Sequence, residues 1–129
     1  MEELIVHLEL IRITAKQIHY SEKGDCFYSN HLLMDRIAKD MYDFEDSIIE
    51  SIIMAETGEP PVMSDIYSTI ASKTDLLSLI KQTIYLVEEK AKKDRFQGDY
   101  DLLGRISNNL RQSFALLSRV LIKGDKVSE

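Results

Sequence analysis

The chain has few of the cysteines and prolines, and none of the long apolar runs, that several classes of protein require. It has one cysteine, Cys26, in 129 residues, which excludes an intrachain disulfide framework and indicates a reducing compartment such as the cytoplasm. No apolar run approaches the roughly 18 residues of a membrane-spanning helix. Glu2 and Glu3 stand where a signal peptide needs positive charge. With two prolines and no strand-like run bounded by turn residues, the sequence predicts an all-α protein that neither spans a membrane nor is exported.

Basic residues are outnumbered by acidic ones. Against 22 Asp and Glu there are 16 Lys and Arg, for a formal net charge of −6, which does not favour a broad nucleic-acid-binding surface. The 44% hydrophobic and 29% charged fractions are those of a folded protein. Because a domain typically has about 150 residues, residues 1–129 are expected to form a single domain.

Apolar residues three and four positions apart predict four long helices. The first covers residues 3–20. The second begins near Ser29 or Asn30, both good N-caps, and runs to about Glu56. Two prolines within 58–61 end it, because proline cannot continue a helix.

The third and fourth helices follow a longer connection. The third is expected to begin at Ser72 or Thr74 and to end near Gly98, and the fourth to run from an Asp99 N-cap to about Gly124. The predicted core-facing residues are Leu4, Leu8, Ile11, Ala15 and Ile18, then Leu33, Ile37, Met41, Phe44, Ile48, Ile52 and Ala55, then Leu76, Ile80, Ile84 and Val87, and finally Leu102, Leu103, Ile106, Leu110, Phe114, Leu117 and Leu121.

The connection between the second and third helices is long enough to hold a short helix of its own, expected at 64–71. Two long helices, a long connection and two more long helices fit a four-helix bundle with one crossover. That connectivity is the ferritin-like one.

The second helix carries residues of metal-binding type. His31 and Asp35 are four apart and share a face, as do Asp46 and Glu50. His19 ends the first helix, across a short connection from His31, so the two imidazoles can lie close together. The alternative is that the histidines are half-buried and satisfied by backbone groups, and that the acids form a solvated face.

Distance along the helix restricts how these residues can cooperate. Asp35 and Asp46 lie about 16 Å apart at 1.5 Å per residue, whereas metal–ligand bonds are about 2 Å long. If the two pairs cooperate, a second copy must pack antiparallel, giving two equivalent sites in a two-fold dimer. Imidazole and carboxylate ligands suit Fe(II), although Zn and Mn also accept them. No Glu-x-x-His occurs, so a di-iron site inside one bundle is not expected.

These residues together form a motif that resembles a known family, the Dps proteins or miniferritins. The family motif is His-Trp-x-x-Lys-Gly, a Phe, a second His twelve residues after the first, an Asp four further on, and a final Asp and Glu one turn apart. This sequence reads His19-Tyr20-Ser21-Glu22-Lys23-Gly24, then Phe27, His31, Asp35, Asp46 and Glu50. Every ligand offset matches, and the resemblance extends generically to the rest of the chain.

The resemblance implies an iron-oxidising function. His19, His31 and Asp35 of one subunit would face Asp46 and Glu50 of a two-fold mate. His19, His31 and Glu50 would bind iron directly, Asp46 would bind or bridge, and Asp35 would help to hold a second iron. The family oxidises Fe(II), often with hydrogen peroxide, and stores ferric mineral in a hollow dodecamer, which limits oxidative damage. A non-catalytic ferritin-like shell or interaction protein that has lost metal turnover is the alternative.

The sequence departs from the family in two respects. Tyr20 replaces the usual Trp beside the first histidine. The basic N-terminal arm with which some members bind DNA has no counterpart before the first helix, and Lys123 and Lys126 are too few to replace it. A DNA-compacting role is therefore not favoured, and DNA binding is expected to be weak or absent.

One further acidic group lies where the family lines its iron-entry pore. Asp94, Asp99 and Asp101 flank the start of the fourth helix. The alternative is that Asp99 is an N-cap and that its neighbours are solvated.

Overall fold

The computed structural model describes residues 1–21, 27–61, 72–94 and 96–128, and these ranges contain helices and no strand. The elements are α1 (Glu2–Ser21), α2 (Phe27–Ile48), the π-helical turn η1 (Ile49–Ile53), α3 (Met54–Thr57), α4 (Lys73–Lys92) and α5 (Gln97–Ser128). Because α2, η1 and α3 follow one another without a break, the described chain forms four long helical rods, which confirms the all-α prediction.

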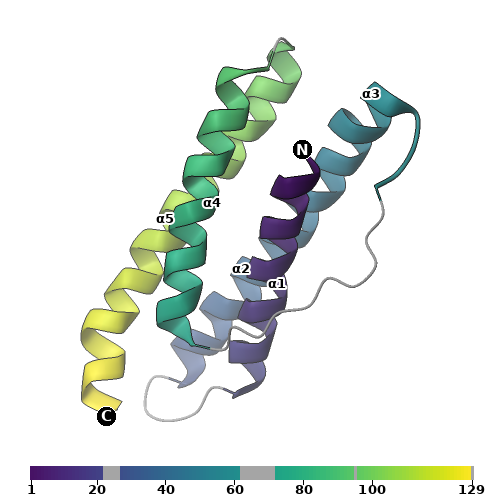
Figure 1. Cartoon of the computed structure of the whole chain (residues 1–129). Helices are drawn as coiled ribbons and strands as arrows, with labels where there is room; N and C mark the ends of the chain where they lie inside the picture. Colours follow the sequence, from purple (N-terminus) through teal and green to yellow (C-terminus); the bar gives the residue numbers. More distant parts are fainter. Residues whose placement is uncertain (22–26, 62–71, 95, 129) are drawn as a thin grey trace.

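The rods pack as two antiparallel pairs (Figure 1). α1 lies against α2, α4 lies against α5, and the pairs meet through α1 with α4 and α2 with α5. α2 and α4 run in the same direction, so α3 ends at the opposite end of the bundle from the start of α4 (Figure 1). The short helix expected at 64–71 and the turn expected at Gly24 lie outside the described residues.

The predicted apolar faces form the core, with one exception. All of the core residues predicted on α1 are buried, and those on α4 and α5 are buried or half-buried. Ala55 was expected to continue the stripe but is exposed. The reason is η1, where the Met54 amide donates to the Ile49 carbonyl, five residues back. The wider turn buries both Ile52 and Ile53 and turns the following residues away from the core.

The helix ends differ from the sequence prediction by a few residues. The third rod starts as expected, with the Ser72 hydroxyl accepting a hydrogen bond from the Asp75 amide at 3.1 Å, but it ends earlier, at Lys92. α5 begins at Gln97, so Asp99 lies in its first turn and is not the N-cap. An acidic residue in the first turn still stabilises a helix through the macrodipole.

Candidate functional site

The two histidines of the motif meet at one end of the α1–α2 pair. His19 lies in the last turn of α1 and His31 in the second turn of α2. Their rings stack with centroids 3.7 Å apart and an interplanar angle of 24°. Nδ1 of His19 lies 3.0 Å from the carbonyl oxygen of His31, and Nδ1 of His31 lies 3.4 Å from the carbonyl oxygen of His19. The prediction that the two imidazoles lie close together is confirmed.

The reciprocal contact defines which ring nitrogen donates in each histidine. A carbonyl oxygen only accepts, so each Nδ1 carries a proton and donates it, and Nε2 is the ring nitrogen left to act as a metal ligand. Histidines that bind metals through one nitrogen nearly always donate the other N–H to a carbonyl or a carboxylate. The same contact also satisfies the simpler expectation for these half-buried residues, a backbone partner for each ring.

A pocket of about 320 Å³ opens beside this pair, in the groove between α1 and α2. Asp35 lines it together with His19, one turn along α2 from His31. The ring of Tyr20 stands edge-on to the His19 imidazole with centroids 5.1 Å apart, and it is largely exposed. The pocket is lined by Arg12, Lys16, His19, Tyr20, Asp35, Ala38, Lys39 and Tyr42.

The other two residues of the motif lie farther along the same rod. Asp46 on α2 and Glu50 on η1 are both exposed, and neither lines the pocket that holds His19 and Asp35. Within the described part of one copy, no three His, Cys, Asp or Glu side chains gather as a metal site. The structure therefore brings the two histidines together, places Asp35 beside them and leaves the second acidic pair apart.

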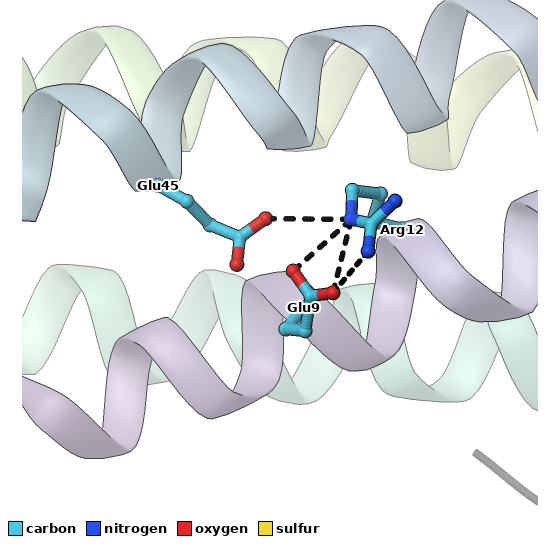
Figure 2. Close-up of polar contacts among 3 residues, drawn as sticks. All are labelled: Glu9, Arg12 and Glu45. Atoms are coloured by element: carbon cyan, nitrogen blue, oxygen red, sulfur yellow. Dashed lines mark hydrogen bonds and ion pairs between the residues drawn. The ribbon is translucent and has the colours of Figure 1, made fainter. Parts of the chain in front are cut away.

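An ionic cluster between the same two helices, whose Arg12 also lines the pocket, escaped the sequence analysis (Figure 2). Nε of Arg12 lies 3.1 and 3.0 Å from the two carboxylate oxygens of Glu9, and a terminal guanidinium nitrogen also contacts Glu9. Glu45 on α2 points at the same guanidinium, with its Oε2 3.8 Å from Nε. Glu45 is only 5% exposed, although it has an ionisable side chain. Its position between Met41 and Ile48 in the apolar stripe was the signal that could have revealed its burial.

The two carboxyls of this cluster have unequal proton affinities. Burial, together with a hydrogen bond and charge repulsion from Glu9, raises the pKa of Glu45 to about 9. Burial also acts to raise the pKa of Glu9, but hydrogen bonds from Arg12 and Glu45 hold it below its ordinary value. Glu45 is therefore protonated at neutral pH and Glu9 is ionised, so one proton and one guanidinium are shared by the pair.

The acids expected near a pore lie at the opposite end of the bundle from the histidines. Asp94 accepts a hydrogen bond from the Phe96 amide at 3.0 Å, and Asp101 accepts one from Gln97 at 2.8 Å. The pKa of Asp99 is raised by burial and by the nearby Asp94 and Glu56. Each of these contacts is local to the α4–α5 turn and its neighbours.

Comparison with known proteins assigns no family to this chain. No protein-family model matches the chain, and no curated protein matches it. None of the helices in the described ranges is long and apolar enough to cross a membrane.

Proposed function

We propose that this chain is a Dps-type miniferritin with a ferritin-like fold, assembled in the cytoplasm as two-fold dimers within a hollow dodecamer. Its substrate is Fe(II), which it oxidises and stores as ferric mineral, thereby limiting oxidative damage. His19, His31 and Asp35 of one copy and Asp46 and Glu50 of a second copy hold the iron.

The reciprocal contact between His19 and His31 carries this proposal. Each ring donates its Nδ1 proton to the other residue's carbonyl, which fixes both orientations before any metal binds. Ligands that are already oriented lose little freedom on binding, and the backbone partner raises the basicity of Nε2. Asp35, beside them in the groove, adds a carboxylate of the kind that Fe(II) accepts together with imidazole.

A second copy supplies the acids that one copy leaves apart. The exposed carboxylates of Asp46 and Glu50 bring negative charge to the site formed by the two imidazoles and Asp35, whose pocket is also lined by Arg12, Lys16 and Lys39. This set of oxygen and nitrogen ligands suits a divalent cation. In the reaction, two Fe(II) ions are oxidised to Fe(III). Their two electrons, with two protons, reduce one hydrogen peroxide to two water molecules. The chain's own residues bind and orient the iron.

Rapid iron oxidation tests this function directly. Metal-free protein is mixed with Fe(II) and stoichiometric hydrogen peroxide, and the absorbance of Fe(III) is followed. We expect fast oxidation in the wild type and in the control Glu59→Ala, which removes an exposed acid outside the proposed site. Glu50→Ala and His31→Ala should lose it. Wild-type oxidation no faster than that of Glu50→Ala would leave the non-catalytic assembly protein as the better function.

Mixed assemblies test whether two copies share one site. Chains with His31→Ala and chains with Glu50→Ala each lack one ligand of every site. When the two chains are co-expressed, a dimer of one of each holds one complete site and one site that lacks both ligands. Partial recovery of oxidation is expected, and its absence in verified mixed dimers would contradict shared ligation.

A further inference from the structure

The pocket between α1 and α2 is lined mainly by positive charge, although the chain as a whole is acidic. Three of its lining residues are cations, Arg12, Lys16 and Lys39, and one is an acid, Asp35. The whole chain has a formal net charge of −6. The pocket therefore has the opposite charge balance from the chain that forms it, and a concave surface lined by one sign of charge attracts ions of the other sign.

The two lysines reach the pocket from different helices and have no acidic partner. Lys16 lies on α1 and Lys39 on α2, and both are exposed. Neither forms an ion pair with another described residue. Asp35 and Lys39 are four positions apart on one helix, a spacing at which acids and bases often pair, yet these two do not. Both ammonium groups are thus available to a ligand.

Arg12 is the third cation, and its orientation is already fixed. Its Nε and one terminal nitrogen contact Glu9, and Nε also lies 3.8 Å from Oε2 of Glu45 (Figure 2). No hydrogen bond or ion pair among the described residues uses the other terminal nitrogen, whose N–H groups can donate. A group that is already oriented loses little freedom when it binds an anion. Glu9 balances the charge of Arg12, so the surplus positive charge of the pocket comes from Lys16 and Lys39.

We propose that this pocket binds a small tetrahedral oxyanion, with inorganic phosphate as the probe, between Arg12, Lys16 and Lys39. The oxygens of such an anion point in several directions, so one anion can accept charge-assisted hydrogen bonds from both helices at once. The volume of about 320 Å³ equals that of about ten water molecules, which is room for phosphate and bridging waters. Asp35 is the one lining group that repels the anion. The site needs neither iron nor a second copy, so it does not depend on the proposed function.

Carboxylates of a second copy are the competing occupants of these cations. In an assembly of the proposed kind, Asp46 and Glu50 of the other copy approach the histidines beside this pocket and compete with phosphate for Lys16 and Lys39. The double variant Asp46→Asn/Glu50→Gln removes both negative charges and keeps the side-chain shapes. Phosphate bound by the double variant but not by the wild type would show that the lysines serve those carboxylates, and would overturn the proposal.

Equilibrium dialysis of the metal-free full chain against radiolabelled phosphate measures the binding. The ionic strength is held constant with sodium chloride, because salt screens exposed charges. Wild type is compared with Lys16→Gln and Lys39→Gln, in which the side chain stays polar but loses its charge. Lys81→Gln is the matched control, because Lys81 is an exposed lysine on α4 that does not line the pocket. Asp35→Asn removes the one lining acid.

We expect the wild type to bind one phosphate per chain saturably. Lys16→Gln and Lys39→Gln should each weaken the affinity about two- to fivefold, and Asp35→Asn should strengthen it by a similar factor. Lys81→Gln should leave it unchanged, and the circular dichroism of all four variants should match wild type because each side chain is exposed. No saturable binding, equal affinity in Lys39→Gln and Lys81→Gln, or an affinity that does not rise in Asp35→Asn would overturn the proposal.

Discussion

The buried carboxyl of Glu45 should make the folded state less stable as the pH rises. In the folded state the pKa of Glu45 is about 9, whereas its ordinary value, expected in the unfolded chain, is 4.5. Between these values the folded state binds a proton that the unfolded state does not, so the unfolding free energy falls with pH. The stability that this proton supplies is fully present below the lower pKa and is lost as the pH rises through the upper one.

The expected slope is at most about 1.4 kcal/mol per pH unit, the free energy equivalent of one proton. Glu9, whose pKa is lowered, is ionised in both states above about pH 5 and does not offset this slope there. Glu45→Gln keeps a donor for Glu9 but does not titrate. Urea unfolding followed by circular dichroism between about pH 5 and pH 8, at constant protein concentration, measures the difference between variant and wild type.

The difference in unfolding free energy between Glu45→Gln and wild type should change with pH in one direction. Glu45→Gln should become more stable relative to wild type with each step towards alkaline pH. The matched control Glu59→Gln, at an exposed position, should stay parallel to wild type over the same range. A constant difference between Glu45→Gln and wild type would refute the reasoning that Glu45 is protonated when folded.

Three further predictions concern stability and are read from urea unfolding. Gly58, at φ 77°, and Gly104, inside α5, both have open space where a Cβ would lie. Gly58→Ala should lower the unfolding free energy by about 1 kcal/mol because its backbone is left-handed, whereas Gly104→Ala should raise it by about 0.5–1 kcal/mol. If both substitutions changed the unfolding free energy in the same direction, backbone conformation would not explain the effects. Ser72→Ala should cost about 1 kcal/mol through the lost cap, and Ser72→Asp should restore it. Met41→Ala should cost about 2–5 kcal/mol because Met41 is fully buried; a cost well below 1 kcal/mol would contradict that burial.

The local pattern of residues predicted most of the helical architecture. The apolar spacing of α1, α4 and α5 predicted their buried faces, because a helix must turn its apolar stripe towards its neighbours. Ser72 was one of two predicted caps, with Thr74, because its hydroxyl needs only the amide of Asp75, three residues away. The proximity of His19 and His31 was also foreseen, since a short connection joins the two helix ends.

Tertiary packing decided the features that depend on distant residues. The apolar stripe of α2 could have indicated that Glu45 is buried, but its partners Glu9 and Arg12 lie 36 and 33 positions earlier on α1, and no local pattern on α2 records them. Ala55 is exposed because the wide turn before it brings both Ile52 and Ile53 into the core and interrupts the regular period. The sequence by itself determined which residues could serve as ligands and where helices form. Only the tertiary structure decided which of those side chains meet, because burial and hydrogen-bond partners depend on how two helices pack against each other.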